Sequence, residues 1–327
     1  MRDANQTQQI DIGKAVAEFA KPDLSTSFWQ LANSILPYLA ILFLMYKSLA
    51  TSYWITIFMA FPAAGFLIRI FIIFHDCGHN SFFRLRAANY WTGSFLGFLL
   101  YVPFAHWKFD HAQHHASVCN LDYRGAGDIW TLSVNDFMKA SGWRRFLYRF
   151  ARSPFFFLIF PPLFLKNRFV PKGANLQQRY SIYLINLWLV VVAILAHFSI
   201  GITNFILIQL PVLMIASAVG IWLFYVQHQF RGALWQRSSD WDQVKAALRG
   251  TSYYKLPRLL QWFSGNIGFH NVHHLSPRVP NYNLEKCHKS NPILQGVPIL
   301  TFSASLQTLR NHLWDEDASN FIDFNKL

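Results

Sequence analysis

Residues 53–79 read YWITIFMAFPAAGFLIRIFIIFHDCGH, an apolar run from Tyr53 to Phe74 that passes directly into two histidines, His75 and His79. A helix needs about 20 apolar residues to cross a bilayer, at roughly 1.5 Å per residue. The run is therefore long enough to span a membrane. Because residues four apart share one face of a helix, both imidazoles would emerge together at its end. This stretch predicts a membrane-spanning helix with potential metal ligands at its exit.

Three further runs have the length and composition of membrane spans, and short connections join the four into two hairpins. These runs are about residues 28–46, 181–198 and 203–226. The expected fold is an all-α integral membrane protein with four transmembrane helices in two hairpins and a helical cap. The cap would comprise the cytosolic or interfacial residues 75–180 and 227–327. We find no repeat or linker, so residues 1–327 are expected to form one domain.

Two shorter apolar runs lie between the hairpins, at Gly93–Ala105 and Pro154–Leu165. Runs of about 12 or 13 residues are more often interfacial than spanning, and Pro161-Pro162 interrupts the second. We expect both to lie along the membrane face. We also expect Arg69, in the last turns of the second span, to extend its side chain to the membrane interface.

The charge distribution predicts the orientation in the membrane. Hydrophobic residues make up 53% of the chain and charged residues only 14%, which suits contact with lipid. Residues 75–180 contain 13 Lys and Arg and residues 227–327 contain 11, whereas the two tight connections contain only Lys47. Lys and Arg accumulate on the cytoplasmic side, so both termini and the cap should be cytosolic. The net charge of +13 therefore indicates a membrane surface rather than nucleic acid.

The cysteines and the N-terminal residues add two expectations. Cys77, Cys119 and Cys287 are odd in number and lack CxxC spacing, so neither a disulfide framework nor a zinc ribbon is indicated. The first 27 residues lack the apolar core of a signal peptide.

Eight of the thirteen histidines fall in three boxes. The boxes are His75-Asp-Cys-Gly-His79, His111-Ala-Gln-His114-His115 and His270-Asn-Val-His273-His274. Each box presents two or three imidazoles to one side of a helix. If they were buried without a metal, these rings would leave many donors and acceptors to satisfy. Since the second and fourth spans return to the same side, all three boxes should face one compartment and form a metal site.

The other five histidines are less tightly patterned. His228 ends the fourth span as the first box ends the second, so it is either a ninth ligand or an interfacial helix cap. His106, His197, His288 and His312 have no partner at ligand spacing. We expect them to be structural or surface residues.

The number of histidines indicates two metal ions, because a catalytic zinc takes about three protein ligands. Imidazole suits zinc, copper, iron and nickel alike. A membrane enzyme is expected to act on an apolar substrate, and breaking an unactivated C–H bond with dioxygen requires an oxidising metal centre. Two iron ions fit this requirement. Because the chain has only Glu18, Glu285 and Glu316, a carboxylate-bridged site like that of soluble di-iron bundles is excluded in favour of an all-histidine site.

The boxes resemble those of the membrane fatty-acid desaturases, in particular bacterial acyl-lipid members related to the plant omega-6 and omega-3 enzymes. The resemblance includes the surrounding sequences Phe74-His-Asp-Cys-Gly-His79 and Gly265-Asn-Ile-Gly-Phe-His-Asn-Val-His-His274 and extends over most of the chain. It implies an oxygen-dependent desaturase with a di-iron centre, and His228 matches the family's isolated ligand. The implied ligands are His75, His79, His111, His114, His115, His228, His270, His273 and His274.

Departures from related groups narrow the resemblance. Animal acyl-CoA desaturases have four residues between the histidines of the first box, where this chain has three, and an Asn at the position of Phe224. Front-end desaturases have Gln at the position of His270. The chain has no His-Pro-Gly-Gly of a fused cytochrome b5 domain, so electrons should come from a separate ferredoxin or cytochrome b5-like donor. The basic surface would attract either an acidic donor or anionic lipid headgroups.

The expected reaction removes two hydrogens from neighbouring methylenes of an acyl chain held in an apolar tunnel. Polar residues near the boxes are candidates for orienting the imidazoles. These are Asp76, Asp110, Asp122, Asn266 and Asn271.

Three alternatives remain at this stage. The metal boxes are equally compatible with a hydroxylase or ketolase that acts on an alkane, carotenoid or sphingolipid. A membrane zinc protease has His75 and His79 at the required spacing but Asp76 where its general-base Glu should stand. The ligands of a metal transporter should line a path through the membrane, whereas these histidines lie beyond the span ends.

Overall fold

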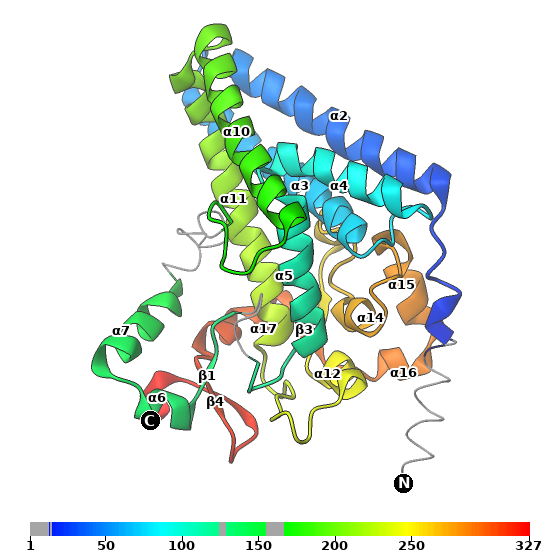
Figure 1. Cartoon of the computed structure of the whole chain (residues 1–327), viewed down its shortest axis with the longest axis vertical. Helices are drawn as coiled ribbons and strands as arrows, with labels where there is room; N and C mark the ends of the chain where they lie inside the picture. Colours follow the sequence, from blue (N-terminus) through cyan, green and yellow to red (C-terminus); the bar gives the residue numbers. More distant parts are fainter. Residues whose placement is uncertain (1–12, 14, 124–128, 155–166) are drawn as a thin grey trace.

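The computed structural model describes residue 13 and residues 15–123, 129–154 and 167–327. Four long helices extend from one end of the molecule, and shorter helices with a few short strands form the other end, which we call the cap (Figure 1). The long helices are α2 (Leu24–Ser48), α3 (Tyr53–Gly78), α10 (Leu176–Ser199) and α11 (Ile202–His228). All four are long and apolar enough to cross a membrane. The predicted arrangement of four spans in two hairpins is therefore confirmed.

The helices extend slightly beyond the apolar runs because polar residues begin or end them. Asp23 caps α2, since its Oδ1 accepts a hydrogen bond from the backbone N–H of Thr26 at 2.8 Å. Asn175 and Gln178 form a reciprocal capping box at the start of α10. Such caps satisfy N–H groups that have no partner within the helix. Both N-termini therefore lie outside the apolar segments.

Helix α3 is the central one of the four. In its most apolar stretch 56% of the residues are buried, against 22% for α2, 17% for α10 and 22% for α11. It packs against α2, α11 and α4 (Arg86–Leu100). The other three helices keep most of their apolar surface available for lipid.

Arg69 of α3 is buried rather than extended to the membrane interface. Its guanidinium lies over the ring of Trp262, 3.9 Å from the centroid, and it donates a hydrogen bond to the Trp262 carbonyl. Trp262 belongs to α13 (Arg258–Phe263), a short helix of the cap that packs on α3. The charge of Arg69 therefore holds part of the cap against the span.

The predicted interfacial run Gly93–Ala105 is divided between α4 and α5 (Phe104–Ser117). Tyr101 ends α4 in the left-handed conformation, with φ of 55°, and Pro103 precedes α5. The chain therefore turns between the two helices, and α5 carries the second histidine box to α3. The second run, Pro154–Leu165, lies outside the described residues apart from Pro154.

The cap is mostly helical and contains two small sheets. In the three-stranded sheet, β1 pairs parallel with β4, and β4 pairs antiparallel with β5. In the other sheet β2 and β3 pair parallel. Strands of two or three residues are too short to show an alternating pattern, which is why the sequence did not predict them. The strands are β1 (Leu132–Ser133), β2 (Tyr253–Lys255), β3 (Ile299–Thr301), β4 (Leu313–Asp315) and β5 (Asn320–Ile322). The remaining helices are α6 (Val134–Lys139), α7 (Gly142–Ala151), α12 (Gln243–Arg249), α14 (His270–Leu275), α15 (Asn281–Ser290), α16 (Pro292–Gln295), α17 (Phe302–Gln307), η1 (Thr308–Arg310) and η2 (Phe324–Lys326).

One apolar core joins the cap to the ends of two spans. It includes Ile72 of α3 and Val226 of α11 together with Phe269, Val272 and Leu284 of the cap. Because the C-terminal ends of α3 and α11 are packed into this core, the histidines at these ends are held in fixed positions.

Candidate metal centre

Four helices bring the nine candidate histidines together. His75 lies in the last turn of α3 and His79 caps that helix. The second box lies on α5, His228 is the last residue of α11, and the third box starts α14 at His270. The first box and His228 therefore continue their spans, as the sequence predicted.

In the described part of the chain, the nine histidines form two groups, and within each group the nitrogens available for a metal lie within 4.8 Å of one another. Group A contains His75, His79, His111, His115 and His273. Group B contains His114, His228, His270 and His274. The rings of His115 and His274 stack across the boundary with centroids 4.2 Å apart, so the two groups form one cluster.

Each HxxHH box is shared between the groups. In the second box, His111 and His115 belong to group A and His114 to group B. In the third box the assignment is reversed, since His270 and His274 belong to group B and His273 to group A. In each box the first and last histidines are four residues apart and point the same way on the helix. The middle histidine, His114 or His273, is rotated away from them. Two such helices facing each other are therefore placed to offer imidazoles to two neighbouring positions.

The ring nitrogens approach each other closely. The Nε2 atoms of His228 and His270 lie 2.9 Å apart, and those of His115 and His273 are also 2.9 Å apart. A neutral imidazole has one N–H and one lone pair, so closely facing nitrogens must share a proton or a cation. The donor set of five and four imidazoles, with no carboxylate oxygen in either group, fits two ions of an imidazole-binding metal.

Burial prepares these rings for metal binding. It lowers the pKa of six cluster imidazoles well below the ordinary value, and neighbouring imidazoles lower the pKa further. The affected rings are those of His79, His111, His115, His270, His273 and His274. They are therefore neutral near pH 7, and a metal ligand must be the neutral form of histidine.

A buried polar network lies behind group A. Oδ1 of Asp76 lies 3.4 Å from Nδ1 of His75. Its other oxygen accepts hydrogen bonds from the backbone and side-chain amides of Asn281, at 2.7 and 2.8 Å. Asn281 in turn exchanges two hydrogen bonds with the side chain of Gln30 on α2. We call these three residues, Asp76, Asn281 and Gln30, the amide network. Sequence analysis missed Gln30 and Asn281, although a Gln inside an apolar span was a signal.

The other candidates for orienting imidazoles have different partners. Asp122 binds Arg237 and the backbone of Ser238 at the surface, so its predicted role is wrong. Asp110 lies 3.8 Å from His106, outside both groups. The side chain of Asn266 bonds to Gln261 and to the carbonyl of Asn281. The side-chain amide of Asn271 is buried and makes no hydrogen bond within the described residues.

Aromatic rings line the cluster. Trp107 of α5 stacks on His111 with centroids 4.5 Å apart and an interplanar angle of 18°. Phe224 lies 5.0 Å from His114 and 5.2 Å from His228, so an apolar ring stands at the position that the sequence comparison singled out. The remaining histidines, His106, His197, His288 and His312, belong to neither group.

Comparisons with known proteins agree with this geometry. Residues 22–301 match the family model described as fatty acid desaturase. The chain is 45% identical over 320 residues to a protein of Bacillus subtilis (strain 168) named "Fatty acid desaturase", covering 97% of this chain and 91% of the relative. It is 28% identical to an "sn-1 oleoyl-lipid 12-desaturase" of a Synechocystis species, covering 67% and 63%. It is 25% identical to an "Omega-6 fatty acid desaturase, chloroplastic" of Spinacia oleracea, covering 84% and 66%.

Proposed function

This chain belongs to the fatty acid desaturase family, whose members desaturate acyl chains, and on that premise we propose that it desaturates lipid-linked acyl chains with a di-iron centre. The observation that carries the proposal is the convergence of nine histidines into groups of five and four. Removal of two hydrogens by one dioxygen needs two further electrons and two protons and yields two waters. The name of the Synechocystis relative, which specifies an oleoyl lipid, supports a lipid-linked substrate.

The nine histidines would hold the two ions, with five imidazoles in group A and four in group B. When bound, iron supplies the oxidising chemistry with dioxygen that breaks unactivated C–H bonds. The buried rings bind metal without first losing a proton, because their pKa values are low. Asp76 orients His75, and Trp107 and Phe224 exclude water from the cluster.

We further propose that the centre faces the cytosol at a bacterial inner membrane. The connections at residues 49–52 and 200–201 contain no Lys or Arg, whereas the cap is rich in both. A separate ferredoxin or cytochrome b5-like protein would supply the electrons to the cap. The proposal treats residues 1–327 as one domain, since the ends of α3 and α11 share a core with the cap.

The test is gas chromatography with mass spectrometry of the lipids of a host that expresses the chain. We expect new unsaturated acyl chains with the intact protein, none with His273→Ala, and undiminished product with His197→Ala. His197 is exposed on α10 and lies outside both groups, so it is a matched control. Hydroxylated or ketolated lipids in place of unsaturated chains would refute desaturation. Unchanged product with His273→Ala would refute the ligand assignment.

A further inference from the structure

Helix α7 is held against the cap by one face. Tyr148 is fully buried, and its hydroxyl donates a hydrogen bond to the carbonyl of His312. Arg152, which directly follows the helix, is also buried and donates to Oε1 of Gln229 at 3.0 Å. These contacts fix the rotation of α7 about its axis. The opposite face of α7 therefore points away from the cap in a fixed direction.

That opposite face carries an apolar stripe consisting of Trp143, Phe146 and Phe150. Their exposed fractions are 67%, 56% and 46%. Successive rings stack, with centroids 5.4 Å apart for the first pair and 6.5 Å for the second. At about 100° per residue, all three lie on the side of the helix opposite Tyr148. Isolated exposed apolar residues are ordinary, but a contiguous stripe marks an interaction surface.

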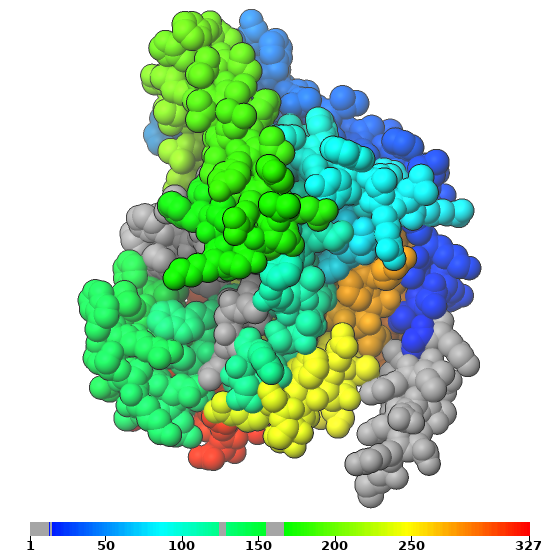
Figure 2. Space-filling view, in the orientation of Figure 1, coloured from blue at the N-terminus to red at the C-terminus, as the bar shows by residue number. Residues whose placement is uncertain are grey.

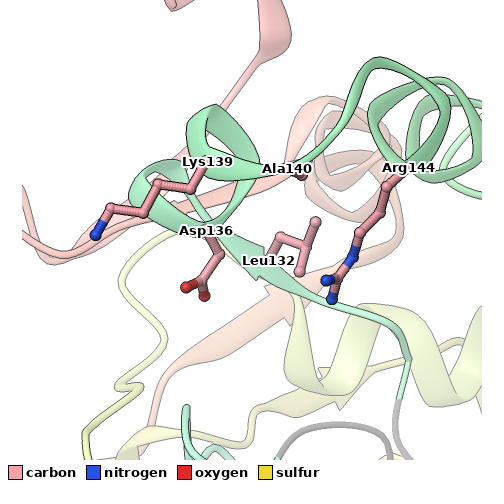
Figure 3. Close-up of a pocket in the computed structure, with 5 residues that line it drawn as sticks. All are labelled: Leu132, Asp136, Lys139, Ala140 and Arg144. Carbon is pink, nitrogen blue, oxygen red and sulfur yellow. The ribbon is translucent and has the colours of Figure 1, made fainter.

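Cations lie on α7 and beside its N-terminal end. Residues 134–151 contain four Lys and Arg and one acidic residue, Asp136. Figure 3 shows an open pocket near the N-terminal end of α7, with Lys139 and Arg144 on opposite sides. Both side chains are exposed, and Leu132 and Asp136 lie between them. The combination of aromatic residues and cations on one helix is typical of helices that lie in a membrane interface.

The position of α7 agrees with this chemistry. Residues 152–175 connect it to α10, a helix apolar enough to span a membrane. In Figure 1 α7 lies at the side of the cap, away from α14 and α15. Figure 2 shows the same segment forming the outer edge of a lobe at the side of the molecule.

We propose that α7 is a membrane-surface helix, whose apolar stripe inserts at the headgroup boundary of an anionic bilayer while Lys139 and Arg144 bind phosphate headgroups. Anionic headgroups are the complement of these cations, and aromatic rings favour that depth of the bilayer. The proposal does not depend on the metal or on the reaction. In this role α7 would anchor its part of the cap to the membrane. Because Arg152 bonds to Gln229, the anchor would also hold the residues that follow His228.

The test measures contact of α7 with lipid in the full-length protein reconstituted in nanodiscs. A fluorophore is attached to Phe146→Cys, or to Trp143→Cys as a second position, and quenched by phosphatidylcholine that is spin-labelled near its headgroup. The native cysteines Cys77, Cys119 and Cys287 are buried and leave little background. Tyr183→Cys, exposed near the start of α10, is the lipid-contacting reference, and Ser239→Cys, exposed on the cap, is the aqueous reference.

We expect lipid quenching at position 146 to be several-fold stronger than at position 239 and to approach that at position 183. Added phosphatidylglycerol should increase it, and Lys139→Glu with Arg144→Glu should remove the increase, since each cation near an anionic surface changes association roughly fivefold.

Quenching at position 146 no stronger than at position 239 would overturn the proposal. Protection from both the spin label and aqueous iodide would also overturn it, because protein would then cover the stripe. Equal quenching with and without phosphatidylglycerol would overturn the headgroup assignment.

Discussion

Groups A and B have similar donor atoms but different support. Group A is attached to the first hairpin through α3, and Asp76 stands behind its His75. Group B is attached to the second hairpin through His228 of α11. Among the described residues, three group B rings have a buried Nδ1 without a hydrogen-bond partner, those of His228, His270 and His274, and group A has two such nitrogens, Nε2 of His79 and Nδ1 of His115. In group A the protein supports ring orientation through the amide network, whereas group B has less such support.

If the proposed di-iron centre forms, this difference predicts that its two sites are unequal. Ligating histidines that are hydrogen-bonded on their other nitrogen bind metal more tightly, because the ring orientation is already set. We therefore expect the first iron ion to enter group A. Because α5 and α14 contribute to both groups, filling the cluster also ties the two hairpins together.

Removal of one ligand from each group gives the largest expected effect. His79→Ala should empty group A and His228→Ala should empty group B, and each should abolish desaturation. Plasma mass spectrometry of the purified proteins should find about one iron per chain in each variant, in place of two in the unchanged protein. His197→Ala should retain both. If either variant loses both ions, the groups are one cooperative site and the comparison fails.

The sequence predicted which histidines cluster but not which of them belong to group A and which to group B. The boxes and span ends located all nine residues because helical periodicity and topology are local features that composition reveals. Which imidazoles share a group depends on how α5 faces α14, and that follows from packing over long sequence distances. The same reason explains why Asn281 was missed and Asp122 was misassigned. The contacts of Asn281 with Asp76 and of Arg237 with Asp122 join residues far apart in the chain, so the local sequence pattern does not reveal them.

Asp76→Asn should produce the second largest effect, confined to group A. The substitution keeps the shape but removes the negative charge behind His75, and loss of such partners lowers metal affinity by about 10–100-fold. After mild chelation we expect about one iron per chain, and none in the double variant with His228→Ala. Asp122→Asn, which alters a carboxylate at the surface, is the matched control. Loss of iron from group B instead would reverse the proposed order.

The pH dependence of stability tests the burial of both groups together. The unfolded chain takes up protons below about pH 6.5, whereas the buried rings, whose pKa values are lowered, do not. The metal-free protein should therefore lose stability as pH falls below 6.5, by up to about 1.4 kcal/mol per pH unit for each ring. Thermal unfolding in detergent between pH 7.5 and 5.5 measures this. His273→Asn, with one ring fewer, should show a shallower decline, and an unfolding temperature independent of pH would contradict the burial.

Gln30→Leu should give the smallest effect, at the far end of the amide network. Asn281 would lose both hydrogen bonds to Gln30 but keep those to Asp76, so we expect a cost of about 1 kcal/mol in the free energy of unfolding. Iron binding to group A should weaken by less than the loss caused by Asp76→Asn, and group B should not change. Ser34→Ala, on the same helix and buried, is the control because, among the described residues, the Ser34 hydroxyl bonds to the Gln30 carbonyl and to Asn33 and not to Asn281 or Asp76. A loss as large as that of Asp76→Asn would mean that α2, a helix with most of its surface open to lipid, sets the geometry of group A. Equal loss from both groups would mean that the network stabilises the cap as a whole and that groups A and B do not differ in their support.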